Sequence, residues 1–374
     1  MHAIARIHLI AAARPNFMKI APLYHALKRE SWAEPVIVHT GQHYDPGMSG
    51  AFFQDLELPA PHFHLGVGSG THAEQTGRVM IEYEKLLAGG KPSLVVVVGD
   101  VNSTAAATLT AAKMGVKVAH LEAGLRSFDR TMPEEINRIV TDALADLLWT
   151  PSRDADANLL REGVPEEKIR FVGNIMIDSL EIMRLRIDRT DAWRKYGLER
   201  GRYGLVTLHR PSNVDGRESL ERLCSELIGI GSKIPLIFPV HPRTRKNLEA
   251  TGLMTRLKES RGISIEEPIS YVPFMNMVFN CRFAITDSGG IQEETTYLGI
   301  PCLTLRPNTE RPITVTEGTN RLIKPEELGS HVHALLENHG PKGKIPELWD
   351  GHTAERVVKS IHRFLFEDRQ TATT

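Results

Sequence analysis

Short apolar runs alternate along this chain with longer segments in which apolar residues recur at helical spacing. The clearest run is residues 94–98, where five apolar residues follow one another without polar alternation. Such a run is typical of a parallel strand that is buried on both faces. Comparable runs predict strands at 6–11, 35–40, 117–121 and 147–150, with helices at 17–29, 103–113 and 134–144. This order predicts a parallel sheet with helices on both faces.

The same pattern restarts in the second half of the chain. It predicts strands at 204–208, 236–240, 283–286 and 301–305, and helices at 219–228 and 292–298. A charged helical segment at 181–194 separates the two sets of strands. At about 150 residues per domain, a chain of 374 residues is long enough for two domains. We therefore predict an α/β fold with two Rossmann-like, doubly wound domains, residues 1–175 and 176–354.

Composition and charge narrow the function classes. Lys and Arg number 45 and Asp and Glu 46, so the net charge of −1 gives no general attraction to nucleic acid or to an anionic membrane. No apolar run approaches the roughly 20 residues of a membrane helix, and the N-terminus lacks the pattern of a signal peptide. The three cysteines are widely spaced and form no CxxC pair. We therefore expect a cytoplasmic protein without a nucleic-acid or membrane partner.

Candidate chemistry follows the predicted strands. Five of them end at polar or ionisable residues, namely Asp100, Glu122, His209, His241 and Asp287. In open α/β sheets, ligands bind outside the carboxyl ends of the strands, and pockets often form between domains. If the two domains face each other, all five residues line one central cleft.

Two segments have the character of a phosphate site. Arg14 and Lys19 flank the first turn of the first helix, where backbone N–H groups already attract anions. Ser288, Gly289 and Gly290 lie between a strand and a helix, and the glycines permit close approach of the backbone to a diphosphate. One turn later, Glu293 or Glu294 could accept hydrogen bonds from ribose hydroxyls. The alternative is an ordinary solvated loop and a tight turn that needs glycine for its geometry.

Carboxylates are the second signal. Asp100 and Glu122 follow adjacent predicted strands, while Glu134 and Glu135 follow Pro133 at a helix start. Paired carboxylates can separate into one acid and one base, although stabilisation of the helix N-terminus explains at least one of Glu134 and Glu135. His209 and His241 could carry protons or donate to phosphate, or serve only as structural hydrogen-bond donors.

Several familiar signatures are missing from the sequence. It contains no P-loop, HExxH or GxSxG motif. The glycines at 66–70 have the wrong spacing for a dinucleotide fingerprint, and the histidines at 62–72 lack a metal-binding frame. The segment Asp-Ser-Gly-Gly at 287–290 also surrounds the nucleophile of trypsin-like proteases, but those are all-β barrels. We expect no metal and no cofactor.

The complete ordered set of motifs resembles one family. The motifs lie at 14–19, 41–43, 99–100, 120–126, 133–138, 209–210, 286–294 and 309–312. In this order they resemble the non-hydrolysing UDP-N-acetylglucosamine 2-epimerases over nearly the full length of the chain. The resemblance implies the glycosyltransferase-B type of fold, in which the last helix, residues 355–370, crosses back to the first domain.

The resemblance also implies an activity. Members interconvert UDP-N-acetylglucosamine and UDP-N-acetylmannosamine in the cytoplasm, usually as homodimers, and the product feeds the synthesis of surface polysaccharide. They eliminate UDP to give 2-acetamidoglucal and then add it back. By motif match, Asp100, Glu122 and Glu134 supply the acid, base and charge stabilisation, and His209 assists at the diphosphate. UDP would be held by Arg14, Lys19, His241, Ser288, Gly289, Gly290 and Glu294. Which carboxylate is the base stays open.

Some positions depart from the family pattern and keep alternatives open. Ala12 replaces the usual glycine, and Tyr44 and Asp45 stand where many bacterial members carry a second glutamine of an activator site. The loop 41–75 resembles enzymes that epimerise UDP-2,3-diacetamido-2,3-dideoxyglucuronate, whose extra carboxylate could meet Arg126 or Arg130. A hydrolysing epimerase, a transferase of the glycosyltransferase-B type and a nucleotide-sugar sensor are the remaining alternatives.

Overall fold

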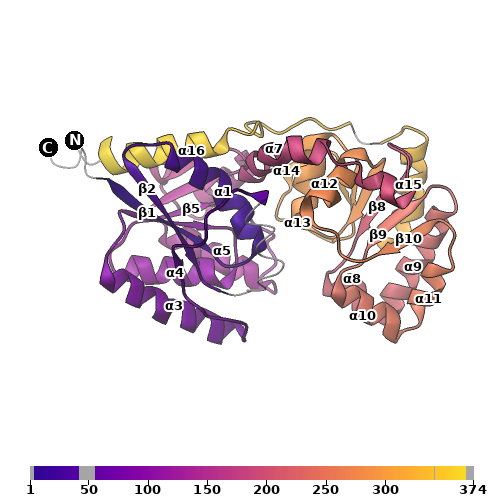
Figure 1. The fold of residues 1–374 in the computed structure, drawn as a ribbon, viewed down its shortest axis with the longest axis horizontal. Helices are drawn as coiled ribbons and strands as arrows, with labels where there is room; N and C mark the ends of the chain where they lie inside the picture. Colours follow the sequence, from indigo (N-terminus) through magenta and orange to yellow (C-terminus); the bar gives the residue numbers. More distant parts are fainter. Residues whose placement is uncertain (1–3, 42–54, 341, 368–374) are drawn as a thin grey trace. The chain divides into compact units, whose positions relative to one another are not determined.

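The computed structural model of the protein describes residues 4–41, 55–340 and 342–367. The chain divides into two compact units (Figure 1). Unit 1 comprises residues 1–182 and 347–374, and unit 2 comprises residues 183–346. Each unit is described by itself below.

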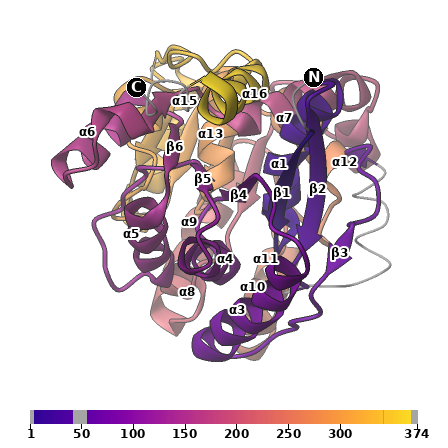
Figure 2. The same ribbon diagram turned by 90° about the vertical axis from the view of Figure 1, so that its left-hand side faces the viewer.

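Unit 1 is built around a seven-stranded sheet in which every pairing is parallel. Its order is β3-β2-β1-β4-β5-β6-β7, and most of these strands can be followed side by side in Figure 2. The strands are β1 (Ala5–Ala11), β2 (Ala33–His39), β3 (Phe63–His64), β4 (Leu94–Val98), β5 (Val118–Leu121), β6 (Leu147–Thr150) and β7 (Ile169–Phe171). All five residues of β4 are buried, as its unbroken apolar sequence predicts.

Helices cover both faces of this sheet. They are α1 (Arg14–Lys28), α3 (His72–Gly89), α4 (Asn102–Lys113), α5 (Pro133–Leu144), α6 (Arg153–Arg161), α7 (Ile175–Asp188) and α16 (Thr353–His362), which continues as a π-helix over Arg363–Glu367. A 3-10 turn lies at Glu166–Lys168. Helix α1 packs with α16, whereas α4 packs between α3 and α5 on the other side (Figure 1).

Unit 2 repeats the architecture with six parallel strands in the order β10-β9-β8-β11-β12-β13. The strands are β8 (Gly204–Thr207), β9 (Leu236–Pro239), β10 (Ile263–Glu266), β11 (Phe283–Thr286), β12 (Cys302–Thr304) and β13 (Asn320–Leu322). The helices are α8 (Pro211–Val214), α9 (Arg217–Gly231), α10 (Pro242–Ala250), α11 (Leu253–Lys258), α12 (Tyr271–Asn280), α13 (Gly289–Leu298), α14 (Ile313–Thr316) and α15 (Leu328–Leu336), with 3-10 turns at Ala192–Tyr196 and Pro325–Glu327. Its core is one cluster of buried aliphatic and aromatic side chains around β8, β9 and β11.

The end of the chain belongs to unit 1. The indole Nε1 of Trp149 donates to Ser360 Oγ at 2.9 Å. The Asp178 carboxylate accepts hydrogen bonds from the backbone N–H groups of Thr353 and Ala354, at 3.1 and 2.7 Å. The units divide at residues 182/183 and 346/347, whereas the sequence predicted 175/176 and 354/355. Helix α7 begins at Ile175 and runs through both the predicted boundary and the observed one.

Several predicted helices begin earlier in the structure than in the sequence pattern, two of them by three residues. Helix α1 begins at Arg14 rather than Phe17, with Pro15 in its first turn, where proline is well tolerated. Helix α13 begins at Gly289 rather than Gln292, so both glycines belong to the helix. The charged segment 181–194 is not one helix, since α7 ends at Asp188 and a separate 3-10 turn follows. Apolar periodicity misses such ends because the first turn of a helix need not contribute to the core.

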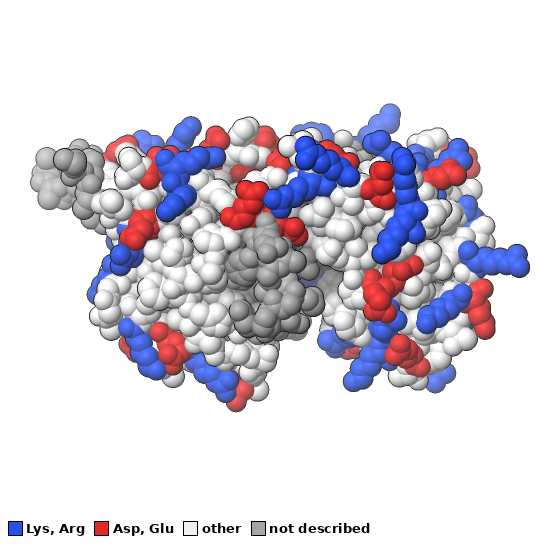
Figure 3. Space-filling view, in the orientation of Figure 1, with Lys and Arg blue, Asp and Glu red and all other residues white. Residues whose placement is uncertain are grey.

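The surface of each unit carries mixed charge. Acidic and basic side chains are interspersed on the face shown in Figure 3. Within the described ranges, every helix is too short or too polar to cross a membrane. Cys224, Cys281 and Cys302 are buried free thiols.

Candidate active site

Both sheets reverse their winding direction at a switch point, and the candidate residues gather there. In unit 1 the order changes direction between β1 and β4, and in unit 2 between β8 and β11. Ligands of doubly wound sheets bind outside the carboxyl ends of the strands at such a point. Asp100 follows β4 and Glu122 follows β5. His209 follows β8, and Ser288 follows β11.

Glu122 is held in an unusual backbone conformation. Its φ of +73° lies in the left-handed region, which residues other than glycine seldom adopt. Its side chain is buried and forms an ion pair with Lys19 from α1. Strained residues of this kind persist only where their surroundings hold them, and they cluster at functional sites. The geometry supports the functional interpretation of Glu122.

Lys19 is fixed by the turn that precedes its helix. The side chain of Asn16 accepts from the Ala13 N–H at 3.0 Å and donates to the Val98 carbonyl at 3.1 Å. This pair of bonds ties the start of α1 to the end of β4. A Cβ atom on Gly99 would lie 2.9 Å from Lys19 Nζ, so only glycine leaves room for the lysine. The predicted phosphate ligand Lys19 is therefore also the buried counter-ion of Glu122.

Asp100 and Glu135 share one arginine. Arg138 of α5 pairs with the Asp100 carboxylate and, at 2.8 Å, with Glu135 Oε2. Glu135 also accepts from the backbone N–H groups of Ser127 and Phe128, at 3.0 and 2.9 Å. Burial opposes ionisation of Glu135, but the Ser127 N–H and the Arg138 guanidinium outweigh it and lower the pKa of that carboxyl. Glu135 is the structural member of the Glu134–Glu135 pair.

Glu134 is exposed and lines a pocket instead. The pocket has a volume of about 360 Å³ and includes His72, Gln75, Asp100, Asn102, Glu134 and Asn137 in its wall. The amide of Asn102 donates to Gln75 Oε1 at 2.8 Å, and that of Asn137 donates to the Asp100 carbonyl at 2.9 Å. The lining residues include two carboxylates but no lysine or arginine. This surface suits a hydroxyl-rich, uncharged group.

In unit 2, Asp287 fixes the orientation of His209. The buried Asp287 carboxylate lies 2.8 Å from His209 Nδ1 and accepts from the backbone N–H groups of His209 and Arg210 and from Asn213 Nδ2. Burial opposes ionisation, but the His209 ring and these donors lower the pKa of Asp287. A carboxylate at Nδ1 selects the protonated form of that nitrogen. Nε2 of the half-exposed His209 ring is then the atom available to a ligand.

His241 lies beside His209, with the two ring centroids 5.6 Å apart. It caps α10, because its Nδ1 accepts from the Arg243 N–H at 3.2 Å. Burial and the neighbouring His209 lower the pKa of His241, so the ring is neutral near pH 7. A neutral ring whose Nδ1 accepts carries its proton on Nε2, which is suited to donate to an anion.

The two glycines at the start of α13 differ in their surroundings. A Cβ on Gly289 would lie 2.8 Å from Glu310 Oε1 and 3.0 Å from an Arg311 nitrogen, whereas Gly290 faces open space. Gly289 is therefore required by packing inside unit 2. The Ser288 N–H donates to Thr286 Oγ1 at 3.0 Å. The first-turn N–H groups of α13 lack intrahelical acceptors, as at any helix start, and can bind an anion.

Glu294 is a buried carboxyl one turn further along α13. Tyr271 donates its hydroxyl to Glu294 Oε1 at 2.8 Å. Burial, assisted by the neighbouring Glu293, raises the pKa of Glu294 to about 8. Glu293 itself pairs with Arg311 at 2.8 Å. Glu294 is therefore mostly protonated at neutral pH and can both donate and accept hydrogen bonds.

Some of the surrounding residues were not among the candidate site residues predicted from the sequence. Arg138, Asn213 and Tyr271 each bond directly to a candidate residue. Arg138 had a detectable signal, since it lies four residues after Glu134 on the same helix. Asn213 and Tyr271 lie far from their partners in sequence and had none. The side chain of Arg14 lies outside the described atoms.

One residue suggested for an extra substrate carboxylate is already engaged. Arg126 is buried and pairs with Asp142 at 2.7 Å and with Glu162 at 2.6 Å. It is therefore not free to bind a ligand. Arg130, the other suggestion, is exposed. Within residues 4–41, 55–340 and 342–367, no cluster of His, Cys, Asp or Glu side chains is arranged to hold a metal ion.

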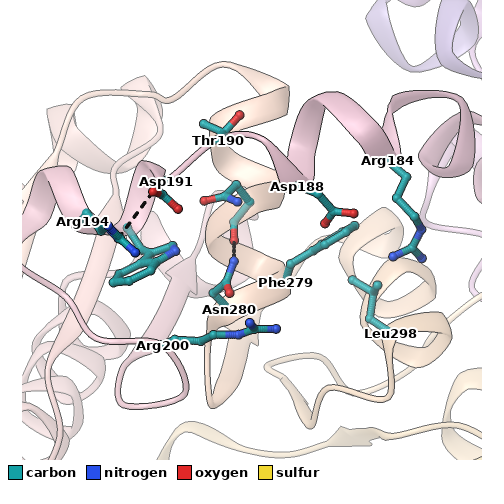
Figure 4. Close-up of a pocket in the computed structure, with 11 residues that line it drawn as sticks. Arg184, Asp188, Thr190, Asp191, Arg194, Arg200, Phe279, Asn280 and Leu298 are labelled. Atoms are coloured by element: carbon teal, nitrogen blue, oxygen red, sulfur yellow. Dashed lines mark hydrogen bonds and ion pairs between the residues drawn. The ribbon is translucent and has the colours of Figure 1, made fainter.

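A larger hollow in unit 2 lies away from these residues (Figure 4). Its volume is about 680 Å³, and it borders the amino ends of β8 and β11, near Arg200 and Asn280. Among its charged side chains, Arg194 lies 3.5 Å from Asp191, and the Arg184 guanidinium lies over the Phe279 ring. We place the candidate site at the carboxyl ends of the strands, where ligands of doubly wound sheets bind.

The fold and the site define a class of protein. Two parallel sheets with alternating helices, each with polar side chains at its switch point, are the architecture of two-domain α/β enzymes of the glycosyltransferase-B type. Residues 25–362 match the family model described as UDP-N-acetylglucosamine 2-epimerase. The chain belongs to this family of epimerases, which confirms the predicted family, fold class and enzyme class.

Individual relatives agree with this assignment. The UDP-N-acetylglucosamine 2-epimerase of Methanocaldococcus jannaschii is 43% identical over 367 residues, covering 95% of this chain and 98% of the relative. Its crystal structure with UDP-GlcNAc and UDP matches with a TM-score of 0.86 at 41% identity, covering 95% and 99% of the two chains. The UDP-2,3-diacetamido-2,3-dideoxy-D-glucuronate 2-epimerase of Pseudomonas aeruginosa is 39% identical over 322 residues, covering 85% and 88%.

Proposed function

We propose that the protein catalyses the reversible C2 epimerisation of UDP-N-acetylglucosamine to UDP-N-acetylmannosamine. The observation that carries this proposal is the gathering of Asp100, Glu122 and Glu134 around the carboxyl edge of one sheet in a member of the epimerase family. The crystal structure of the M. jannaschii relative with UDP-GlcNAc and UDP supports the choice of substrate.

The chemistry explains why several carboxylates are needed. The proton at C2 is not next to a carbonyl group, so simple enolisation cannot remove it. In the proposed reaction, a carboxylate removes the C2 proton and the C2–H electron pair becomes the C1–C2 double bond. The C1–O bond breaks, and its electron pair leaves with UDP. UDP then adds back to the 2-acetamidoglucal while a protonated carboxyl delivers a proton to the other face of C2.

The residues divide this work between the two units. In the proposal, Asp100, Glu122 and Glu134 serve as acid, base and stabilisers of the positive charge that develops at C1. Lys19 balances the charge of Glu122 from within unit 1. His209, whose Nδ1–H is held by Asp287, presents Nε2 to the departing diphosphate and donates to it in the doubly protonated imidazolium form. The closing together of these groups in a cleft between the units stays a prediction.

The UDP moiety is assigned mainly to unit 2. We propose that His241 and the start of α13, with Ser288, Gly289 and Gly290, bind the diphosphate, and that Glu294 binds the ribose hydroxyls. Three features support this assignment: the neutral His241 ring, the open space at Gly290 and the partly protonated Glu294 carboxyl. Arg14 and Lys19 complete the proposed set.

The diacetamido-glucuronate sugar is the second candidate, because the P. aeruginosa relative is 39% identical. The pocket beside Asp100 favours the first candidate. Its lining residues provide two carboxylates and no cation, and Arg126 is already paired with Asp142 and Glu162. A substrate carboxylate there would face the like charges of Asp100 and Glu134, and the Arg138 guanidinium beside them is already shared by Asp100 and Glu135. An N-acetylglucosamine ring is uncharged and avoids this cost.

The cellular setting is also a proposal. We place the enzyme in the cytoplasm as a homodimer that supplies UDP-N-acetylmannosamine for surface polysaccharide. The family resemblance supports this setting, and the three buried free thiols are compatible with a reducing compartment. Light scattering on the purified protein tests the dimer, and a monomer mass at working concentration would contradict it.

Proton NMR in deuterium oxide tests the reaction itself. With UDP-N-acetylglucosamine, we expect deuterium at C2 and a second anomeric signal from the manno epimer, with UDP retained in the sugar nucleotide. Neither deuterium nor epimer would contradict the proposed function, and turnover of the diacetamido-glucuronate sugar alone would favour the second candidate. Free N-acetylmannosamine formed as fast as UDP would instead identify a hydrolysing epimerase.

A further inference from the structure

We propose that His120 and Asp142 form a buried positioning pair that holds the three carboxylate-bearing segments of unit 1 in mutual register. Neither residue is placed in contact with substrate. The segments are the end of β4 with Asp100, the end of β5 with Glu122, and helix α5 with Glu134. The inference deepens the proposed function, on which its kinetic test rests.

Both nitrogens of the His120 ring are engaged. His120 lies in β5 and is completely buried. Its Nε2 is 2.9 Å from the Gly99 carbonyl oxygen, and its Nδ1 is 2.6 Å from Asp142 Oδ1. A carbonyl can only accept, as can an ionised carboxylate, so each ring nitrogen must carry a hydrogen for both bonds to form. The ring is then a cation whose charge is balanced by Asp142.

Asp142 extends the connection to the loop after β5. Its Oδ2 accepts from the Gly124 N–H at 3.0 Å and pairs with Arg126 at 2.7 Å. Burial opposes ionisation, but His120 and Arg126 together lower the pKa of Asp142. Arg126 in turn donates to both carboxylate oxygens of Glu162, at 2.8 and 2.6 Å. Positive and negative side chains therefore alternate along this series, from His120 through Asp142 and Arg126 to Glu162.

The connections explain how a strained Glu122 is maintained. Gly99, bound by His120, directly precedes Asp100, and Glu122 follows His120 by two residues. After Glu122, the next two N–H groups are fixed by the Trp149 carbonyl at 3.0 Å and by Asp142. A residue at positive φ relaxes when such restraints are removed. The pair thus determines where the Glu122 carboxylate lies relative to Asp100.

Two substitutions of His120 test its two hydrogen bonds separately. His120→Asn retains a donor near the position of Nδ1 and loses the bond to Gly99, whereas His120→Gln retains one near Nε2 and loses the bond to Asp142. We expect each to lower kcat for C2 epimerisation by about 10- to 100-fold, the cost of misplacing catalytic groups by a fraction of an ångström. The Kd for UDP should change by less than about threefold, since transition-state interactions alone are lost.

His8 provides the matched control. It is also buried, lies in β1 of the same sheet, and its Nδ1 is 3.2 Å from the Tyr83 hydroxyl rather than near a carboxylate segment. His8→Gln should lower the thermal midpoint to a similar extent and leave kcat within about threefold of wild type. An equal fall in kcat in His8→Gln and His120→Gln would overturn the proposal. If His120 variants do not fold, the isosteric Asp142→Asn takes their place.

Amide hydrogen exchange tests the positioning role in the absence of substrate, because it measures how firmly the backbone of these segments is held. In the His120 variants we expect exchange at residues 99–102 and 122–128 to rise at least about tenfold, as a locally released segment does, while His8→Gln leaves these segments unchanged. Unchanged exchange in the His120 variants would overturn the positioning role. If wild type forms no C2 epimer, the proposed function fails, and the exchange data still decide on the pair.

Discussion

At the scale of single residues, neighbouring carboxylates differ through their partners. Glu135 is buried and accepts from two backbone N–H groups and Arg138, whereas Glu134 beside it is exposed at the pocket wall. Glu122 pairs with Lys19, and Asp100 pairs with Arg138. The same residue type is therefore structural at one position and suited to proton transfer at the next.

This contrast gives a test with its own control. Glu134→Gln should lower turnover by about 100-fold or more, as expected for loss of a general acid or base, without changing the thermal midpoint. Glu135→Gln should instead destabilise unit 1 by about 1–3 kcal/mol, because a buried hydrogen-bond acceptor is lost. Calorimetry and the NMR assay read the two effects. The assignment would be contradicted if Glu134→Gln lost stability but kept its activity while Glu135→Gln kept its stability but lost its activity.

A comparable prediction holds for Asp100→Asn. We expect this variant to retain its circular dichroism spectrum and its affinity for UDP while turnover falls by about 100-fold or more. Arg138 would keep its second partner, Glu135, so the helix should stay in place. Loss of the folded spectrum would show that Asp100 is structural rather than catalytic.

The raised pKa of Glu294 has a consequence for stability. Its pKa is about 8 in the folded protein, against 4.5 for the ordinary side chain, so the folded state binds more protons between these values. Its contribution to the free energy of unfolding therefore falls as pH rises from about 4.5 to about 8. Glu294→Gln removes this dependence. Urea unfolding at pH 5 and pH 8 should show the variant gaining stability over wild type at the higher pH, and a constant difference would contradict the raised pKa.

At the scale of elements, the ends of strands and helices place the chemistry. Helix α13 begins with two glycines that look equivalent in the sequence, yet Gly289 abuts Glu310 and Arg311 while Gly290 faces open space. The two glycines are expected to respond differently to the same substitution.

Gly289→Ala should lower the thermal midpoint, since the new Cβ meets a buried, ion-paired side chain at 2.8 Å. Gly290→Ala should leave stability within about 0.5 kcal/mol but weaken UDP binding, because its methyl group would occupy the approach proposed above for the diphosphate. Titration calorimetry with UDP measures the second effect. Unchanged affinity in Gly290→Ala would remove this glycine from the binding surface.

At the scale of the whole molecule, the chain returns to unit 1 after completing unit 2. Helix α16 buries Val357, Val358 and Ile361 within unit 1, and Ser360 accepts from Trp149. The stability of the first sheet therefore depends on residues more than 200 positions away in the sequence, as the separation of 211 between Trp149 and Ser360 illustrates.

Ile361→Ala measures this dependence. It should destabilise unit 1 by about 2–5 kcal/mol, the cost of removing a fully buried aliphatic side chain. Lys359→Ala on the exposed face of the same helix is the control and should stay within about 0.5 kcal/mol of wild type. In calorimetry, the unfolding transition of unit 1 should shift to lower temperature, while the transition of unit 2 should stay unchanged. A shift of equal size in both variants would contradict the packing described for α16.

The sequence by itself determined the alternation of strands and helices, the two doubly wound halves and the residues that follow each strand. These features can be predicted from short stretches of sequence, because an unbroken apolar run and the polar residue after it are recognisable without knowledge of a distant partner. The family resemblance then suggested the reaction proposed above and the proposed roles of Asp100, Glu122, Glu134 and His209.

The tertiary structure alone decided how these residues are paired. Lys19 meets Glu122 from 103 positions away, Asp287 orients His209 from a neighbouring strand, and Asp142 connects His120 to the loop that contains Glu122. Periodicity cannot foresee such pairs, since buried charges choose partners by distance in space and not in sequence. The sequence thus identifies the chemical groups, and the fold determines which of them form ion pairs and hydrogen bonds with one another.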